Sequence, residues 1–333
     1  MKKVLLTGIS GYIGLHCAVE LLKQGYVVKG SIRSLKKAKK VEDTIKKYID
    51  PKGNLEFCEL NLLEDQGWDE AVADCDFVMH VASPFVSKVP KDENELIKPA
   101  VEGTLRALRA AHKASIKRVV LTSSMVAMLG DLKGDNNITK NSWTDVDAKN
   151  ITAYLKSKTI AEKSAWDFVQ HTDMELVTIH PGPVYGPTLS GDLSGESMSL
   201  FKRVLTGELP RMLNASINMS DVRDVAKIHV EALENKKAAN QRFVVASEKS
   251  HAFLEISEEL KDNGYKVGTG IVPNFLVKLL ALFNDEMKGM LPYVGKTYAA
   301  DISETKRTFN WQPMPFKTMV LDTAKSVDGV LKG

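Results

Sequence analysis

The sequence is poor in cysteine and nearly balanced in charge, and each of these shortages excludes a class of protein. Its three cysteines, Cys17, Cys58 and Cys75, are odd in number and lie in apolar segments. A disulfide framework is therefore not expected, and a reducing compartment is the simpler interpretation. The 45 basic and 42 acidic side chains leave a net charge of +3, too small and too evenly mixed for a nucleic-acid-binding surface. We expect no nucleic-acid partner.

Long apolar runs are missing as well. The apolar run that follows Lys2 and Lys3 ends at Thr7, well short of the hydrophobic core of a signal peptide. The most apolar later stretch, residues 275–283, is nine residues long, whereas a membrane-spanning helix needs roughly 20 apolar residues. The wider region 273–291 predicts helices whose Met and Leu side chains pack in the core. We therefore expect a soluble, cytoplasmic protein with no membrane partner.

The first half of the chain carries the pattern of an α/β protein. The chain has 333 residues, 44% of them hydrophobic, which is enough for about two domains. Short β-branched runs alternate with amphipathic stretches such as residues 13–24 and 100–112. This alternation predicts a Rossmann-type, doubly wound parallel sheet with helices on both faces. The expected strands are residues 3–6, 26–32, 55–60, 77–81, 118–122 and 176–179.

The pattern changes after Pro187. Gly, Ser and Leu dominate residues 188–199, and an apolar strand at residues 242–245 then reads as a return to the sheet. The second domain is therefore not expected to be contiguous. We predict a dinucleotide-binding domain of residues 1–187, to which residues 221–247 return. We also predict a smaller, mostly C-terminal α+β substrate domain of residues 188–220 and 248–333.

A glycine-rich turn stands between the first expected strand and the first expected helix. Gly8, Gly11 and Gly14 have the spacing Gly-x-x-Gly-x-x-Gly, which differs from the Gly-x-Gly-x-x-Gly of the usual dinucleotide fingerprint. Glycines here permit a tight turn and let backbone N–H groups approach a pyrophosphate at the positive end of the helix. An ordinary strand-to-helix turn is the alternative, but the strand before and the helix after favour dinucleotide binding.

The end of the second expected strand indicates which dinucleotide is bound. An NAD site has an acidic residue there, which binds the ribose hydroxyls. This strand instead ends at Arg33, and four lysines follow it, Lys36, Lys37, Lys39 and Lys40. A guanidinium stacks on adenine and binds a 2′-phosphate, so the arrangement favours NADPH/NADP+. Most of the lysines are better explained as a solvated helix face.

A phenol, an amine and a hydroxyl are spaced for acid-base chemistry. Tyr154 and Lys158 are four residues apart in a stretch of strong helix formers, so they share one helix face. A phenol has a pKa of about 10, and a neighbouring ammonium lowers it toward the range that is useful near neutral pH. Ser123 and Ser124 end the fifth expected strand, at the edge where doubly wound sheets bind ligands. A hydroxyl there can hold a substrate carbonyl; a Ser pair that only caps the strand is the alternative, and the presence of Tyr154 and Lys158 counts against it.

Taken together, these motifs resemble the extended short-chain dehydrogenase/reductases, and within them the dihydroflavonol-reductase-like group of NADPH-dependent carbonyl (aldehyde or ketone) reductases. The likeness spans nearly the whole chain. It rests on residues 7–14, 80–84, 98–104, 121–124, 154–158, 181–187 and 221–226. The resemblance implies an NADP-dependent oxidoreductase that acts on CH-OH or carbonyl groups.

The resemblance also implies roles for individual residues. The catalytic triad falls on Ser124, Tyr154 and Lys158, and the 2′-phosphate contacts fall on Arg33 and Lys40. Further implied cofactor contacts are those of the glycine turn (Gly8, Gly11, Tyr12, Ile13, Gly14), the adenine site (Asn61, Leu62), the strand ends (Ala82, Ser83, Thr122), the nicotinamide loop (Pro181, Val184) and the catalytic residues Tyr154 and Lys158 themselves.

Two positions depart from the family pattern. Asn61 stands where the family usually has Asp, and its amide oxygen can still accept from the adenine amino group. His180 stands where many members have Asn, and packing at the strand end is favoured over a direct effect on the pocket. The other histidines show no paired metal spacing, so no metal is expected.

These residues predict NADPH-dependent reduction of an aldehyde or ketone to an alcohol, with Tyr154 as the proton donor. Two alternatives stay open, an NAD-dependent nucleotide-sugar epimerase or dehydratase and a non-catalytic NADP-binding sensor. Arg33 counts against the first alternative. The intact set of Ser124, Tyr154 and Lys158 counts against the second.

The substrate is less well specified than the chemistry. Phe85, Met125 and Tyr185 are candidates for an apolar substrate pocket because they lie close in sequence to the catalytic and nicotinamide motifs. Each is equally well explained as a core residue. A small-molecule carbonyl substrate is the expected partner, and both a monomer and a homodimer are compatible with the sequence.

Overall fold

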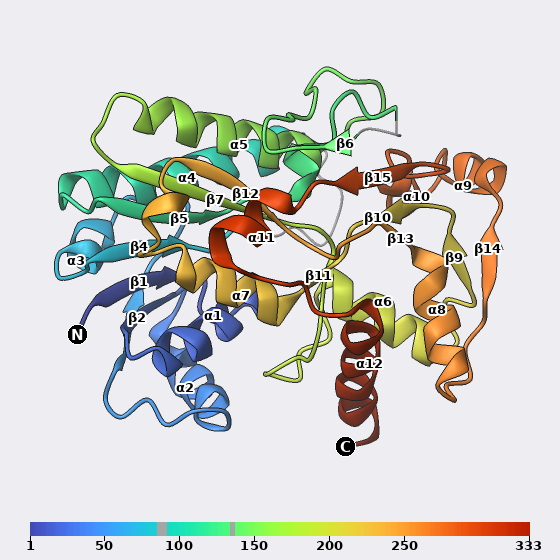
Figure 1. Cartoon of the computed structure of the whole chain (residues 1–333), viewed down its shortest axis with the longest axis horizontal. Coiled ribbons are helices and arrows are strands. Elements are labelled where there is room, and N and C mark those ends of the chain that lie inside the picture. The colour runs from blue at the N-terminus through green and yellow to red at the C-terminus, as the bar shows by residue number, and fades with distance from the viewer. Residues whose placement is uncertain (85–91, 134–136) are drawn as a thin grey trace.

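Seven parallel strands form the central sheet of the chain, of which the computed structural model describes residues 1–84, 92–133 and 137–333 (Figure 1). Their order across the sheet is β12-β7-β5-β4-β1-β2-β3. Every expected strand is present, so the predicted doubly wound α/β fold is confirmed. The strand bounds are Lys3–Thr7 for β1, Val27–Ile32 for β2, Leu55–Glu59 for β3, Phe77–His80 for β4, Arg118–Thr122 for β5, Glu175–Pro181 for β7 and Gln241–Val245 for β12.

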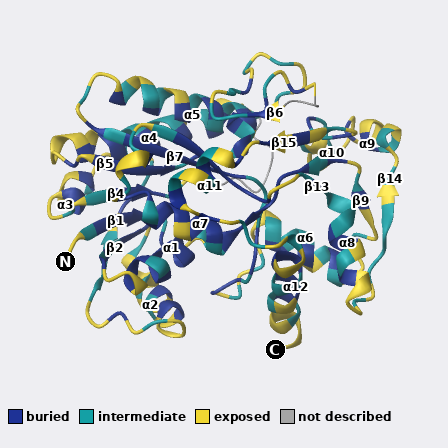
Figure 2. Cartoon of the chain, in the orientation of Figure 1, coloured by how far each residue is buried: buried dark blue, intermediate teal, exposed yellow. Residues whose placement is uncertain are grey.

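Helices cover both faces of this sheet because its strands are apolar on both sides. In β1, Leu5 packs in one core cluster, and its neighbours Val4 and Leu6 pack in the other, since successive residues of a strand face opposite sides. Figure 2 shows the resulting buried strands between two helical layers. One layer consists of α3 (Trp68–Val72), α4 (Asn94–Lys113) and α5 (Ala153–Val169), and the other of α1 (Tyr12–Lys23), α2 (Ala38–Lys46) and α7 (Val222–Glu231).

The carboxyl ends of β1, β4, β5 and β7 lie along one edge of the sheet, because these strands are parallel neighbours. From β1 the chain moves to β2 on one side and later to β4 on the other, so the strand order reverses between β1 and β4. Doubly wound sheets bind their ligands at such a reversal. The glycine turn, Ser124 and Pro181 all follow these strand ends.

The later part of the chain builds a second lobe beyond this edge (Figure 1). Its core lies around Tyr185 and Phe201, whose ring centroids are 5.2 Å apart. Strand β12 instead lies beside β7, where the returning segment is predicted, and the domain limits themselves stay a prediction. The remaining elements are η1 (Leu35–Lys37), η2 (Met125–Ala127), β6 (Asn137–Ile138), β8 (Val184–Tyr185), α6 (Glu196–Leu205), β9 (Arg211–Leu213), β10 (Ser216–Ile217), β11 (Ser220–Asp221), η3 (Lys236–Ala238), β13 (His251–Ala252), α8 (Phe253–Asp262), β14 (Gly270–Val272), α9 (Asn274–Leu280), α10 (Asp285–Met290), β15 (Thr297–Ala300), α11 (Ser303–Phe309) and α12 (Phe316–Lys332).

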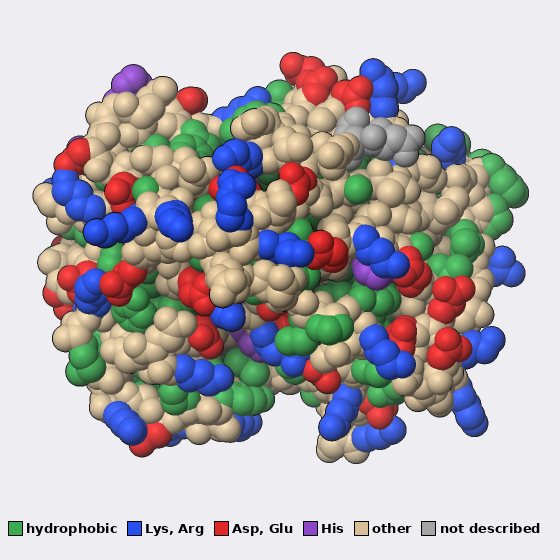
Figure 3. Space-filling view, viewed as in Figure 1, with side chains coloured by type: hydrophobic (Ala, Val, Ile, Leu, Met, Phe, Trp, Pro, Cys, Tyr) green, Lys and Arg blue, Asp and Glu red, His purple; other side chains and the backbone are tan. Residues whose placement is uncertain are grey.

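One packing prediction was wrong. Residues 273–291 form the expected helices, but their apolar side chains lie largely outside the core. Phe275 is 72% and Phe283 is 87% exposed, and in α9 only Val277 is buried. The two short helices pack mainly on each other, which leaves apolar side chains on the surface at this end of the molecule (Figure 3). None of the described helices combines the length and the apolarity needed to span a membrane.

Candidate active site

The glycine turn after β1 is packed so closely that two of its glycines tolerate no side chain. Gly8 has a φ of +71°, and a Cβ there would lie 2.9 Å from the Ala82 Cα. A Cβ on Gly14 would lie 2.1 Å from the Gly8 carbonyl oxygen, so α1 can start this close to β1 only with glycine. A Cβ on Gly11 would meet only that same oxygen, at 3.3 Å. Gly11 therefore keeps the space in front of the helix N-terminus open, as a pyrophosphate site requires.

Thr7 joins this turn to the end of β4. Its Oγ1 accepts hydrogen bonds from the N–H groups of Val81 and Ala82, both at 3.1 Å, and lies 2.9 Å from His80 Nδ1. Burial lowers the pKa of His80 to about 3, so the ring is neutral and its Nδ1 accepts a hydrogen bond from the Thr7 hydroxyl. Ala82 thereby lies against the glycine turn, where the family resemblance expects the wall of the cofactor site.

Arg33 stands exposed at the end of β2. Within the described part of the chain, its guanidinium has no hydrogen-bond or ion-pair partner, and the same holds for the Lys40 ammonium. Lys39, by contrast, pairs with Asp43 at 2.7 Å across one turn of α2, as residues of a solvated helix face do. Arg33 and Lys40 are therefore free to bind an anionic group.

Reversing the charge at Arg33 tests this assignment. Arg33→Asp should raise the KM for NADPH far more than the KM for NADH, because a carboxylate repels a 2′-phosphate and accepts hydrogen bonds from free ribose hydroxyls. The preference for NADPH should fall by roughly tenfold or more, since hydrogen bonds between charged groups are worth ~1.5–3 kcal/mol. Steady-state assays with both cofactors measure it, and Lys39→Asp, at the solvated helix position that pairs with Asp43, is the control. Equal effects on both cofactors would show that Arg33 does not contact the 2′-phosphate.

Tyr154 lies in the first turn of α5 beside Ser124, which follows the end of β5. Its side chain is 44% exposed and forms a hydrogen bond with Ser124. Partial removal from water raises the pKa of Tyr154 to about 12, and the Glu196 carboxylate adds to this rise. The hydrogen bond with Ser124 opposes it. The phenol is therefore protonated across the physiological pH range.

Lys158 lies one turn further along α5, and its Nζ donates to Ser83 Oγ at 3.0 Å. Burial lowers the pKa of Lys158 to about 8, and the Glu162 carboxylate opposes this fall. The sequence assigns the tuning of Tyr154 to the ammonium of Lys158, but the group that lowers the Tyr154 pKa here is Ser124. The ends of β4 and β5 and the first turns of α5 thus meet at one point.

The sequence of the chain matches a known family over most of its length. Residues 4–246 match the model of the NAD dependent epimerase/dehydratase family. The chain belongs to this family. It is 38% identical to cinnamoyl-CoA reductase CAD2 of Medicago truncatula over 249 residues, which cover 73% of this chain and 75% of the relative. It is 32% identical to an anthocyanidin reductase of Vitis vinifera over 286 residues, which cover 80% and 83% of the two chains.

Two solved structures of reductases are similar to the structure of this chain. Yeast methylglyoxal/isovaleraldehyde reductase Gre2, complexed with NADPH, has a TM-score of 0.81 at 24% identity and covers 99% of both chains. Gre2 of Candida albicans, also complexed with NADPH, has a TM-score of 0.78 at 25% identity and again covers 99% of both chains. The predicted resemblance to extended dehydrogenase/reductases is confirmed, and the chain is an enzyme of the nicotinamide-dependent oxidoreductase type.

Two side chains of this chain that are expected to contact the cofactor, Thr122 and Asn61, already form hydrogen bonds with other residues. The Thr122 hydroxyl donates to His229 Nε2 at 2.7 Å, because His229 Nδ1 already donates to the Val225 carbonyl. Both ends of the Asn61 amide bond within their own loop, to Glu64 and to a backbone N–H. The Thr122 hydroxyl can therefore only accept a hydrogen bond from the cofactor, and the Asn61 oxygen keeps one lone pair that can accept from the adenine amino group.

The other expected contacts lie around the same edge of the sheet. The Tyr12 hydroxyl donates to the Gly186 carbonyl at 2.9 Å, which joins the glycine turn to the chain segment that leads into the second lobe. Ile13 packs on the core beneath the turn. The remaining ones are Leu62, which packs near Gly103 of α4, Pro181, which is buried at the end of β7, and Val184, which lies in β8.

Two of the three residues expected to contact the substrate, Met125 and Tyr185, lie in the core. Met125 is fully buried with its Sδ against Gly182, and Tyr185 is 2% exposed and packs on Phe201. Neither side chain has surface through which to contact a substrate, because the turns that carry them fold their apolar side chains into the core. Phe85 lies outside the described residues.

Three residues near the catalytic set belong to no predicted motif. Burial, and after it Tyr154, raises the pKa of Tyr293, and Glu196 of α6 adds to the rise of the pKa at both Tyr293 and Tyr154. Glu196 and Tyr293 come from the second lobe, far along the chain, so no local spacing reveals them. Glu162 is different, because it continues the four-residue spacing of Tyr154 and Lys158, a signal already present in the sequence.

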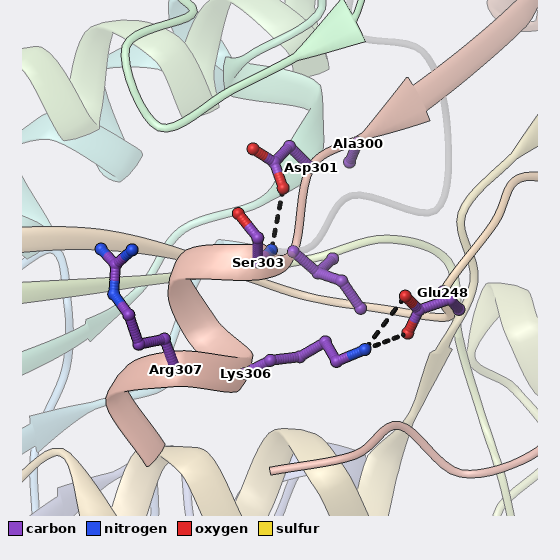
Figure 4. A pocket seen from close by; sticks show the side chains of 7 residues that line it. Glu248, Ala300, Asp301, Ser303, Lys306 and Arg307 are labelled. Carbon is purple, nitrogen blue, oxygen red and sulfur yellow. Dashed lines mark hydrogen bonds and ion pairs between the residues drawn. The ribbon is translucent and has the colours of Figure 1, made fainter. Parts of the chain in front are cut away.

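A hollow lies away from the residues of the predicted site. Its volume is about 410 Å³, and it lies beside α11, where Lys306 Nζ donates to both Glu248 oxygens, at 3.0 and 2.8 Å (Figure 4). Asp301 accepts the Ser303 N–H at 2.8 Å, so much of its polar lining is already paired. None of its lining residues belongs to the predicted site. Across the described ranges, no three His, Cys, Asp or Glu side chains are grouped so that they could hold a metal ion.

Proposed function

We propose that this chain reduces an aldehyde or ketone to the alcohol with NADPH. The observation that carries the proposal is the meeting of Ser124, Tyr154 and Lys158 at the strand ends that also hold the glycine turn. The unpartnered Arg33 and Lys40 support NADPH as the cofactor. The NADPH complexes of the two similar Gre2 structures support the same choice.

Each of these residues has a distinct part in the reaction. When bound, NADPH supplies the hydride that reaches the carbonyl carbon. Ser124 binds the carbonyl oxygen through its hydroxyl, and Tyr154 gives that oxygen its proton, so the products are the alcohol and NADP+. Ser124 stabilises the phenolate that forms on Tyr154, as its effect on the Tyr154 pKa indicates, and we expect the positive Lys158 ammonium one turn away on α5 to add to this. The backbone around Gly11 holds the pyrophosphate at the start of α1.

The residues around Tyr154 also indicate which kind of substrate fits the site. Tyr293 offers an aromatic ring and Glu196 a carboxylate on the side of the second lobe. We infer a largely apolar carbonyl compound that carries a hydrogen-bond donor such as a hydroxyl. The name of the similar Gre2 reductase gives the first aldehydes to test, which are methylglyoxal and isovaleraldehyde.

The test is a panel of carbonyl compounds, assayed by the loss of NADPH absorbance with purified chain. At least one aldehyde or ketone should be turned over, and NADH should support a lower rate. Ser124→Ala, which keeps the fold and removes the hydroxyl from the carbonyl site, should turn over the same compound at a rate lower by about 10²-fold.

Other outcomes would favour the alternatives. Purified chain that carries tightly bound NAD and consumes no NADPH with any carbonyl would favour an epimerase or dehydratase. Tight NADPH binding with no turnover of any compound, including nucleotide sugars, would favour a sensor.

A further inference from the structure

A buried carboxylate lies directly behind the catalytic residues. Glu162 is 1% exposed and lies on α5 one turn after Lys158, which is itself one turn after Tyr154. Its two oxygens accept hydrogen bonds from side chains that come from α5 and from three strands or strand ends: Trp166 Nε1 at 3.2 Å, Ser123 Oγ at 2.6 Å, Thr178 Oγ1 at 3.2 Å, His180 Nε2 at 2.8 Å and Arg242 Nε at 2.8 Å.

These donors are tied to the proposed active site. Ser123 precedes Ser124 at the end of β5, and His180 precedes Pro181 in β7. His180 is 0% exposed, which confirms that it packs at the strand end. Through these hydrogen bonds, Glu162 holds the ends of β5 and β7 against the helix that carries Tyr154 and Lys158. Removing the Glu162 carboxylate would break these hydrogen bonds and would loosen β5, β7 and α5 from one another.

The same carboxylate faces Lys158. Both residues line a cavity of about 20 Å³, which is enough for one water molecule. The titratable groups around the Lys158 amine are Tyr154 and Glu162 on its own helix and His80 on β4, while α4 contributes only the uncharged Ala100, Gly103 and Thr104. His180 and Arg242 lie on the far side of Glu162 and bind it directly.

Glu162 is a fixed anion and not a proton carrier. Burial alone would raise the pKa of Glu162, but His180 and Arg242 outweigh burial and hold this pKa well below its usual range. Its oxygens are also occupied by donors, so Glu162 has no free position from which to exchange a proton. A fixed negative charge at this point favours the charged form of the neighbouring lysine.

We propose that Glu162 is a positioning residue of this active site, which fixes the ends of β5 and β7 against α5 and keeps the Lys158 amine in its charged form. The importance of that charge for turnover rests on the proposed reductase function. The effect of Glu162 on Lys158 does not, because both groups belong to the chain itself. It can therefore be measured without any carbonyl substrate.

The measurement is the pH dependence of the acetylation of Lys158 by acetic anhydride in the intact, cofactor-free chain, followed by mass spectrometry. Only the neutral amine reacts, so the midpoint reports the pKa, which for Lys158 is expected near pH 8. Glu162→Gln keeps the shape and removes the charge, and it should lower the midpoint by roughly 1 pH unit. The alkaline limb of kcat should move by the same amount. Glu162→Asp keeps the charge, so its midpoint should stay near that of the wild type.

Glu175→Gln is the matched control. It breaks the ion pair in which Arg118 Nη2 lies 2.6 Å from Glu175 Oε2, at the opposite ends of the same two strands. This variant should melt at a lower temperature while the Lys158 midpoint and the pH profile stay in place. If Glu162→Gln were folded and left the midpoint unchanged, the proposal would be wrong, even if activity were lost.

Arg242→Gln decides the matter if Glu162→Gln does not fold. Removal of the positive charge beside Glu162 should move the Lys158 midpoint to higher pH, in the direction opposite to Glu162→Gln. An unchanged or lower midpoint would overturn the proposal. A wild-type chain with no carbonyl turnover would instead refute the reductase function, and the labelling result would stand by itself.

Discussion

Tyr154→Phe should lower kcat by about 10² to 10⁴-fold, because the change removes the proposed proton donor to the carbonyl oxygen. The ring and its packing are kept. Tyr154 is 44% exposed, and its partner Ser124 still accepts the Val126 N–H at 3.3 Å, so the loss of the hydroxyl leaves no buried group without a partner. The melting temperature and the affinity for NADPH should therefore hardly change. Steady-state kinetics with the best carbonyl and a binding titration with NADPH measure both effects.

Lys158→Met is the comparison that separates the two roles. It removes the charge near Tyr154 and the hydrogen bond to Ser83, so kcat should fall and NADPH should also bind more weakly. Slower turnover with deuterated NADPH establishes that chemistry limits the rate. If Tyr154→Phe then kept most of its kcat, another group would be the acid.

Gly11→Val should abolish the binding of NADPH and leave the chain folded. A Cβ on Gly11 meets only the Gly8 carbonyl oxygen, at 3.3 Å, but the valine side chain would fill the space where the pyrophosphate approaches α1. In the wild type, NADPH at 100 times its Kd should stabilise the fold by about 2.7 kcal/mol. The variant should lose this stabilisation in a thermal melt. A variant that still melted at a higher temperature with NADPH would show that the pyrophosphate binds elsewhere.

Variants of two other glycines serve as comparisons for Gly11→Val. Gly14→Val should lower the melting temperature even without a ligand, because its Cβ would lie 2.1 Å from the Gly8 carbonyl oxygen. Gly329→Val, on α12 with nothing within 4 Å of an added Cβ, should keep the response to NADPH. Only the Gly11 variant should combine an ordinary fold with a lost response.

The sequence predicts those parts of this protein that depend on neighbours along the chain. The strands of the sheet are short apolar runs between turns, and the glycine turn has its strand and helix on either side, so both were identified correctly. Tyr154 and Lys158 lie on one helix, where four-residue spacing alone brings them to one face. In these cases the local pattern contains the geometry.

Packing between distant segments could not be predicted in this way. Met125 follows Ser124 directly and yet points into the core, while Tyr293, far along the chain, interacts electrostatically with Tyr154. The apolar residues of α9 fit a buried helix by their pattern, but whether another element covers them depends on the whole fold. A hydrophobic pattern indicates that a face can be buried and does not identify what buries it.

The position of β12 has a consequence for how the protein is made. This strand is the last to join the sheet, and a ribosome has to add 245 of the 333 residues before it is complete. Until then β7 has one unpaired edge, and the buried Glu162 lacks the charge that Arg242 brings. The nascent chain therefore cannot complete the seven-stranded sheet before residues 182–240, which build much of the second lobe, have been made. A truncated chain that ends before residue 241 has an exposed strand edge that is prone to aggregation, and it is not a self-contained folding unit.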